Sequence, residues 1–342
     1  MTPAQQRARL PERWRRHLER YGQRSLFLGE AYPRAANAGW RLDARPPGPE
    51  AVIGADPEFA RRQLLDEYGI DYAVLNPSTL LSCQESPPLA AALAAAVNDW
   101  LREEWLAADQ RYLGAIAVPI ECPEVAAREI ERCVELGGGF VQVIVPAGTE
   151  QPLGSPRYRP LFRAAADAGL PVAAHFGGVD DHSGAGWPSY YLEEHVAYAV
   201  RVQAQVASLI CSGIFAELPH LRIVLTEFGF AWVPALAWAL DRAWERLRDD
   251  VAHLDRPPSE LLHDHFWLTT QPVDEPDDPR DFTAMIDHGR LGDRLLFSTD
   301  YPHWDFDSPT QALPRTLPDE LRRRILAGNA CALHHLPLAE AA

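Results

Sequence analysis

Seven short apolar runs, each followed by a longer helical segment, constrain most strongly what this 342-residue chain can fold into. Continuous apolar strands that alternate with helices are typical of a parallel sheet covered on both faces. With no evident linker between the units, they predict a TIM-type (β/α)8 barrel rather than an open doubly wound sheet. The runs are 69–76, 112–119, 140–146, 170–176, 221–227, 265–271 and 294–300; the helical segments are 88–108, 123–136, 157–169, 190–217, 233–249, 279–289 and 318–328.

The first 68 residues have a different character. They contain an arginine-rich amphipathic segment, a loop rich in proline and glycine, and a helix that opens at Asp56-Pro57 and runs to about Glu67. We expect 1–68 to form a helical and irregular segment that packs on a barrel with lid loops formed by 69–342, in a single domain. No convincing strand precedes residue 69, so the first barrel strand is missing or replaced.

Composition excludes several function classes. The net charge is −16, and every one of the 32 basic residues is arginine, which excludes Schiff-base chemistry and a phosphate-loop lysine. An acidic chain repels nucleic acid, and no apolar run is long enough for a membrane span. The N-terminus has no secretory h-region, and the five cysteines are odd in number and far apart. We expect a cytoplasmic protein with a small-molecule partner, a homo-oligomer through long helices such as 190–217.

Three polar residues end predicted strands. His175 closes PVAAHF, Glu227 closes RIVLTE and Asp300 closes LLFSTD. In a parallel barrel the carboxyl ends of the strands form the active-site face, so these side chains are expected to meet there. Such a set can bind a divalent metal that activates water, or can perform acid–base chemistry without metal. For each residue alone, a structural role is the simpler interpretation; their coincidence favours function.

The segments that flank these strand ends supply further candidates. The loop after the first of them contains glycines together with His182, Trp187 and Tyr190, which suits a lid over a flat ligand, although a plain surface loop has the same composition. His303 and Trp304 follow the last strand directly. We expect Trp304 to bind substrate, and His303 either to donate a proton or to order its loop.

A second histidine pair has the spacing of metal ligands but the wrong position. His263 and His265 are separated by one residue, as two ligands on a strand would be. They lie at the beginning of the predicted strand 265–271, so we assign them to the face opposite the active site. No G-x-S-x-G, H-E-x-x-H or phosphate-loop motif is present, which disfavours serine hydrolases, zincins and P-loop enzymes.

From about residue 50 to residue 335, the chain resembles the amidohydrolase-related family of metal-dependent barrel hydrolases and decarboxylases. The most specific segments are LFSTDYPHWDFDSP (296–309), GIFAELPHLRIVLTEFGFAWVPALAW (213–238), LPVAAHFGG (170–178) and NDWLREEW (98–105). The resemblance implies that His175 and Asp300 are metal ligands and that Asp300 is also the proton shuttle. Many relatives carry histidine where this chain has Glu227, which can act as base or ligand. Zinc is the expected metal, and manganese is the alternative.

The chain departs from that family at its first strand. The family begins with a strand ending in H-x-H or D-x-H, and this chain has neither. Either the native chain begins upstream of Met1 and has a complete metal site, or it is shortened and binds metal poorly. We favour the first explanation, because removing a strand from a closed barrel exposes two apolar sheet edges unless residues 1–30 or a partner subunit cover them.

Our main functional hypothesis is a metal-dependent hydrolase that acts on a small cyclic or carboxylated molecule. Non-oxidative decarboxylation of an aromatic or unsaturated acid is the alternative within the same family. A metal-free acid–base enzyme that uses Glu227 and His303 is a further possibility. The hypothesis from another class is a non-catalytic, ligand-binding barrel whose metal site has been lost.

Overall fold

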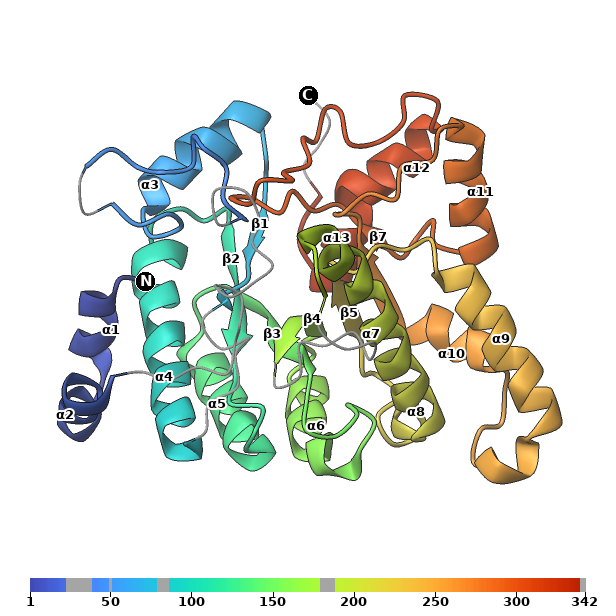
Figure 1. Cartoon of the computed structure of the whole chain (residues 1–342), viewed down its shortest axis with the longest axis horizontal. Coiled ribbons are helices and arrows are strands. Elements are labelled where there is room, and N and C mark those ends of the chain that lie inside the picture. The colour runs from blue at the N-terminus through green and yellow to red at the C-terminus, as the bar shows by residue number, and fades with distance from the viewer. Residues whose placement is uncertain (23–38, 49–50, 79–85, 179–187, 339–342) are drawn as a thin grey trace.

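The chain forms one curled, seven-stranded parallel sheet with helices packed outside it (Figure 1). The structure is a computed structural model that describes residues 1–22, 39–48, 51–78, 86–178 and 188–338. The strands neighbour one another in chain order, and the pairings found among the described residues run from β1 to β7 without joining these two. The strands are β1 (Ala73–Leu75), β2 (Tyr112–Ala117), β3 (Phe140–Gly148), β4 (Val172–Gly178), β5 (Ile223–Thr226), β6 (Phe266–Thr269) and β7 (Leu295–Leu296).

These seven strands coincide with the seven predicted runs, and the predicted barrel-type α/β fold is confirmed. Every residue of β2 is buried, which is what a continuous apolar strand covered on both faces requires. The part of the chain that the structure describes contributes seven strands, and they form a curled, open sheet instead of a closed eight-stranded ring.

The helices that follow the strands stand side by side along the outside of the sheet, as α4, α5 and α6 show (Figure 1). In α5, Pro123 occupies the first turn, and Ala126, Ile130 and Cys133 recur at helical spacing to form the buried stripe. The helices are α1 (Pro3–Arg9), α2 (Glu12–Tyr21), α3 (Pro57–Ala60), α4 (Pro87–Trp100), α5 (Pro123–Leu136), α6 (Arg159–Asp167), α7 (Tyr191–Cys211), α8 (Ile214–Glu217), α9 (Val233–Arg246), α10 (Pro258–His265), α11 (Pro279–Gly289), α12 (Asp319–Arg323) and α13 (Asn329–His334).

Shorter helical pieces extend several of these elements. Wide π-helical turns continue α3, α4 and α12 over Arg61–Asp66, Leu101–Leu106 and Arg324–Gly328. Tight 3-10 turns span Pro156–Tyr158 before α6 and Arg248–Val251 after α9. The predicted helices are therefore present, and the structure adds α10 and α13, which the sequence did not predict.

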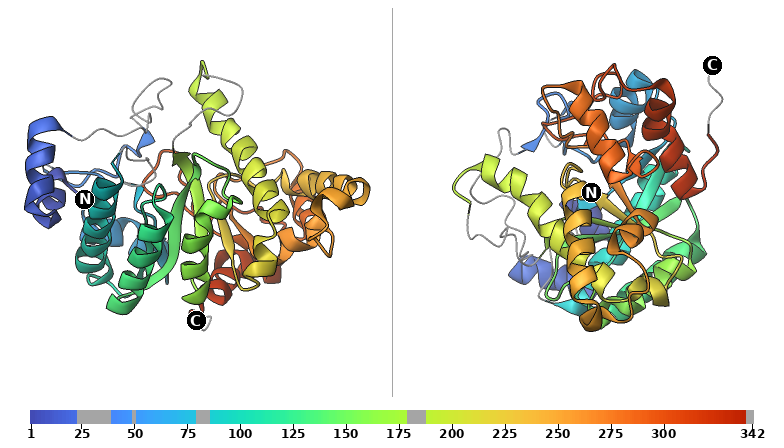
Figure 2. Two further views of the ribbon diagram at one scale, coloured as in Figure 1. Left: turned by 90° about the horizontal axis from the view of Figure 1, so that it is seen from below. Right: turned by 90° about the vertical axis from the view of Figure 1, so that its right-hand side faces the viewer.

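The N-terminal helices lie at one end of the molecule, beside α4 (Figure 2). A capping box between Thr2 and Gln5 starts α1. Leu10 is buried against apolar residues of α4 and β2, and Trp14 and Leu18 pack on the same cluster. Farther along this segment, Trp40 forms an isolated antiparallel bridge with His303, so residues near 40 reach the loop that follows β7.

The predicted site residues and the second histidine pair lie at opposite ends of the strands. His175 in β4 is level with Thr226, the last residue of β5, so both belong to the carboxyl-terminal edge. His263 and His265 belong to α10, which leads into the amino-terminal end of β6, and this confirms their predicted assignment to the opposite face. They lie in a helix instead of a strand, and His265 Nδ1 is 2.9 Å from the carbonyl oxygen of Leu221.

Candidate active site

Two carboxylates reach the carboxyl-terminal edge from an unusual backbone conformation. Glu227 directly follows β5 and has a φ of 70°, and Asp300, in the segment after β7, has a φ of 55°. Left-handed backbone costs about 1–2 kcal/mol in a residue other than glycine and is concentrated at functional sites. The amide of Glu227 donates to Thr269 Oγ1 at 3.0 Å, which fixes this turn to the end of β6.

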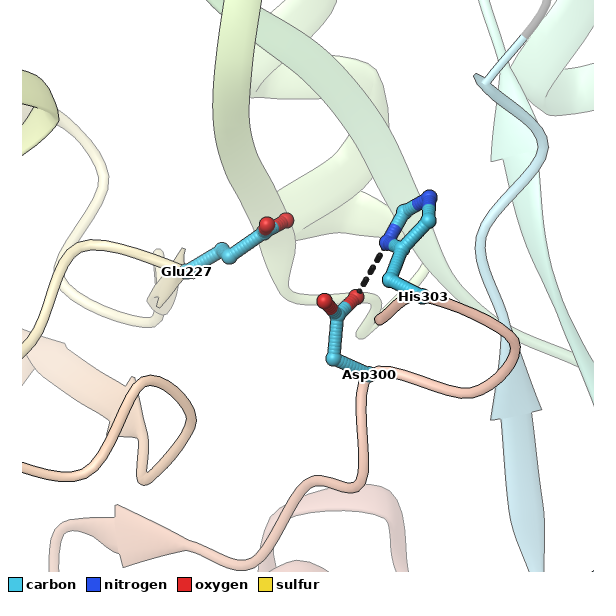
Figure 3. Close-up of side chains that lie close together, drawn as sticks. All are labelled: Glu227, Asp300 and His303. Carbon is cyan, nitrogen blue, oxygen red and sulfur yellow. Dashed lines mark hydrogen bonds and ion pairs between the residues drawn. The ribbon is translucent and has the colours of Figure 1, made fainter. Parts of the chain in front are cut away.

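Glu227, Asp300 and His303 turn their side chains toward one another (Figure 3). Each offers one possible ligand atom, and these atoms lie within 4.8 Å of one another. His303 Nδ1 is 2.7 Å from Asp300 Oδ1, a short charge-assisted contact across three residues of the same loop. The three residues thus form a compact group of two carboxylates and one imidazole, which we call the acidic cluster.

His175 joins the acidic cluster through Glu227. Its Nε2 is 2.8 Å from Glu227 Oε2, and its Nδ1 is 3.0 Å from the carbonyl oxygen of Phe176. A neutral imidazole that donates from Nδ1 to a carbonyl presents the Nε2 lone pair, and metal-binding histidines are commonly oriented in this way. Burial lowers the pKa of His175, but the adjacent Glu227 carboxylate outweighs burial and raises it.

The acidic cluster contains a polar atom that the protein itself does not satisfy. Asp300 Oδ2 is buried and meets no donor at hydrogen-bonding geometry among the described residues. Glu227 Oε2 is also buried, and its neighbour is the Nε2 of His175 at 2.8 Å. Burial and the neighbouring Glu227 charge raise the pKa of Asp300, against the opposing effect of His303. Buried carboxylate oxygens beside an imidazole, one of them without a donor, fit a divalent cation.

The predicted substrate-binding residues differ in where the structure places them. Trp304 lies next to the acidic cluster in sequence, and its indole Nε1 donates to the hydroxyl of Tyr191 at 3.2 Å. Tyr190 is 70% exposed just before α7, and its backbone amide donates to the Glu193 carboxylate at 2.9 Å, so the structure does not bring it to the cluster. His182 and Trp187 lie outside the described residues.

The structure also brings to the site residues that sequence reasoning missed. The ring centroids of Trp40 and His303 are 5.1 Å apart. His195 Nε2 is 3.4 Å from Asp305 Oδ2. A signal for His195 was present in the sequence: together with Tyr191 and Tyr198 it has the i, i+4, i+7 spacing of one helix face. Trp40 had no comparable signal, because it comes from the irregular N-terminal segment.

The predicted metal ligands were His175 and Asp300. The tightest group in the structure contains Asp300 but adds Glu227 and His303, and His175 contacts it through Glu227. The sequence analysis assigned Glu227 and His303 to acid–base chemistry; the geometry also offers both as ligands. Which of the four residues bind metal and which transfer protons stays a prediction.

Comparison with known proteins identifies the family. The family model for amidohydrolases matches residues 11–336. The chain belongs to the amidohydrolase family. Its relatives include the gamma-resorcylate decarboxylase of Rhodococcus jostii (strain RHA1), 30% identical over 272 residues, covering 72% of this chain and 78% of the relative. Another is the 2-amino-3-carboxymuconate-6-semialdehyde decarboxylase of Dictyostelium discoideum, 26% identical over 255 residues, covering 72% and 67%.

A solved structure extends the comparison. The dihydroxybenzoic acid decarboxylase from Polaromonas sp. JS666, with bound manganese and the inhibitor 2-nitroresorcinol, has 26% identity and a TM-score of 0.66. The match covers 82% of this chain and 86% of that one. The family resemblance is thus confirmed, it begins earlier than residue 50, and this amidohydrolase-family chain is an enzyme.

These relatives change the order of our functional hypotheses. All three are named as decarboxylases, so decarboxylation is better supported than hydrolysis, the main hypothesis from the sequence. A divalent metal is supported, but the metal named in the solved relative is manganese instead of the zinc that we expected.

No helix among the described residues is long and apolar enough to cross a bilayer.

Proposed function

We propose that this amidohydrolase-family enzyme is a metal-dependent, non-oxidative decarboxylase of an aromatic acid. The observation that carries the proposal is the acidic cluster at the carboxyl-terminal edge of the sheet, in which Glu227 Oε2 contacts the His175 imidazole and Asp300 Oδ2 is buried without a hydrogen-bond partner among the described residues. The decarboxylase names of the relatives support the reaction class.

The residues that would hold the metal are Asp300, Glu227 and His175. Two carboxylate oxygens and one imidazole nitrogen are a donor set that suits manganese and zinc, and we place manganese first because a relative contains it. His303 is either a further ligand or the proton-transfer partner of Asp300. When bound, the cation supplies Lewis-acid polarisation of substrate oxygens and neutralises the charge of the acidic cluster.

The protein's own part in the reaction is to deliver a proton to carbon. Decarboxylation of an aryl carboxylate requires protonation of the ring carbon that bears the carboxylate. The carbon–carbon bond then breaks, its electron pair returns to the ring, and carbon dioxide leaves. The pair of Asp300 and His303, in contact at 2.7 Å, is placed to hold that proton and release it within the buried site.

The test is an assay of carbon dioxide release from 2,6-dihydroxybenzoate by protein that has been stripped with chelator and then reloaded with manganese. We expect activity to disappear on chelation, to return with manganese, and to fall at least 1000-fold in Asp300→Asn. Asp287→Asn, at an exposed position of α11, is the matched control and should keep full activity.

Activity that survives both chelation and Asp300→Asn would contradict the proposal. A panel of lactones and amides run in parallel separates the two reaction classes, since their cleavage without carbon dioxide release would restore the hydrolase hypothesis. Binding of 2-nitroresorcinol without any turnover would favour the ligand-binding barrel.

A further inference from the structure

A second pair of a histidine and a carboxylate lies beside the acidic cluster. His195, in the second turn of α7, has its Nε2 3.4 Å from Asp305 Oδ2. Asp305 belongs to the loop that carries His303, and its charge contributes to the raised pKa values of both Asp300 and His303. The pair is therefore electrostatically close to the acidic cluster, although it comes from a different helix.

Asp305 is held in place by the sheet. The side-chain amide of Gln271 donates to Asp305 Oδ2 at 2.9 Å and reaches the Asp305 carbonyl oxygen at 3.3 Å. Gln271 is itself buried just beyond β6, and its backbone amide donates to Ser298 Oγ at 3.1 Å. The carboxylate that faces His195 is thus held by residues that follow β6 and β7.

The Asp305 carboxylate faces one ring nitrogen of His195 and leaves the other nitrogen for a ligand. A carboxylate oxygen near Nε2 favours the tautomer with hydrogen on that atom. The lone pair is then on Nδ1, and this atom is buried without a hydrogen-bond partner among the described residues. Leaving a buried acceptor unpaired is unfavourable, and a donor on a ligand would offset that cost.

Aromatic rings surround His195. Ring centroids of Tyr191, Tyr198 and Trp304 lie 5.7, 6.0 and 6.1 Å from its imidazole centroid. The Trp304 indole bonds the Tyr191 hydroxyl, which ties the start of α7 to the loop of His303. Flat, apolar walls next to one unpaired acceptor suit an aromatic ligand with a polar hydrogen.

We propose that His195 is a specificity-determining residue whose Nδ1 accepts a hydrogen bond from a ring hydroxyl of the substrate. The inference rests on the proposed function and narrows the substrate class to hydroxylated aromatic acids. Asp305 and Gln271 are positioning residues that act through His195 and do not contact the ligand.

The experiment compares two probes, 2-nitroresorcinol with its two hydroxyls and nitrobenzene with none, by titration calorimetry against the manganese-loaded protein. His195→Phe should weaken binding of 2-nitroresorcinol about 10-fold, the equivalent of one lost hydrogen bond, and leave nitrobenzene within about twofold. Asp305→Asn, which keeps the shape that Gln271 binds, should give a smaller loss for 2-nitroresorcinol alone. His288→Phe, the same change at an exposed position of α11, is the matched control.

Three results would overturn the inference: no binding of 2-nitroresorcinol to the parent protein, unchanged binding in His195→Phe, or an equal loss for both probes. The two proposals fail in distinguishable ways. Carbon dioxide release with no loss of hydroxyl discrimination in His195→Phe refutes the role of His195 alone. Hydroxyl discrimination without carbon dioxide release refutes the decarboxylase proposal alone.

Discussion

Replacing Asp300 by asparagine should stabilise the metal-free protein while it abolishes activity. The carboxylate is largely buried, with 13% of the side chain exposed, has one oxygen without a partner among the described residues, and faces Glu227, so the folded state holds it at a cost. Asparagine has nearly the same shape, carries no charge, and tolerates the left-handed backbone that Asp300 adopts at a φ of 55°. The substitution therefore removes the charge without adding backbone strain.

The expected change in the free energy of unfolding is the difference between two opposing contributions. Burying a carboxylate costs several kcal/mol, and the bond from His303 at 2.7 Å returns about 1.5–3 kcal/mol. The raised pKa of Asp300 shows that burial and repulsion exceed that return. We expect Asp300→Asn to raise the free energy of unfolding by about 2 kcal/mol at pH 8. In a 342-residue chain this corresponds to about 3 °C in Tm.

The way in which the stability difference between Asp300→Asn and the parent changes with pH provides a second test. Because the folded pKa of Asp300 is raised, the folded carboxyl keeps its proton where the unfolded one has lost it, and the parent loses stability as pH rises above about 4. The stability advantage of Asp300→Asn should therefore be absent in acid and grow with pH. Calorimetric melting of chelator-treated protein at several pH values measures it.

Manganese should reverse the order of the two proteins. At a concentration of 100 times its Kd, a ligand that binds only the folded state adds about 2.7 kcal/mol, so the parent gains about 4 °C and the variant little. Asp287→Asn is the control and should melt like the parent under both conditions. A metal-free Asp300→Asn protein that melts below the parent at pH 8 would refute the reasoning, because the carboxylate would then be a net structural partner of His303.

Three further changes test the fold. Gly178→Ala should cost more than about 4 kcal/mol or prevent folding, because its φ is 118° and an added Cβ would lie 1.7 Å from the Gly148 carbonyl oxygen; expression and urea unfolding measure this. Asn98→Ala should cost about 3 kcal/mol in urea unfolding, since the buried amide bonds the β2 backbone at both polar groups. Burial lowers the pKa of His334 to about 4, so stability should fall by at most about 3 kcal/mol as pH drops from about 6.5 to 4, and His334→Gln should flatten that dependence.

The fold was largely predictable because its strands are buried on both faces. In such a sheet the apolar pattern of a segment such as β2 is continuous and does not depend on knowing its neighbours. The boundary between α10 and β6 was misplaced, because His265 ends a helix that begins at Pro258 directly after Pro257, and the sequence pattern there is typical of a loop. Short helices such as α13 offer too few turns for a recognisable period.

The site was predictable only where its residues end strands. Glu227 and Asp300 follow apolar runs, and parallel topology alone places such residues on one edge. His195 lies in the second turn of α7, and its partner Asp305 is in a loop more than 100 residues later, so only the tertiary fold brings them together. The bridge of Trp40 to His303 depends in the same way on where an irregular segment returns to the sheet.

The same backbone device places both carboxylates of the acidic cluster. Glu227 directly follows β5 and Asp300 lies four residues after β7, and each adopts the left-handed region, which redirects its side chain. Neither residue is glycine or asparagine, so folding would be easier with other residues at both positions. Two left-handed residues whose carboxylates lie close together are difficult to explain as a structural requirement, because an uncharged side chain at either position would stabilise the fold more. Selection for chemistry at this edge explains why the chain keeps a charge at each position.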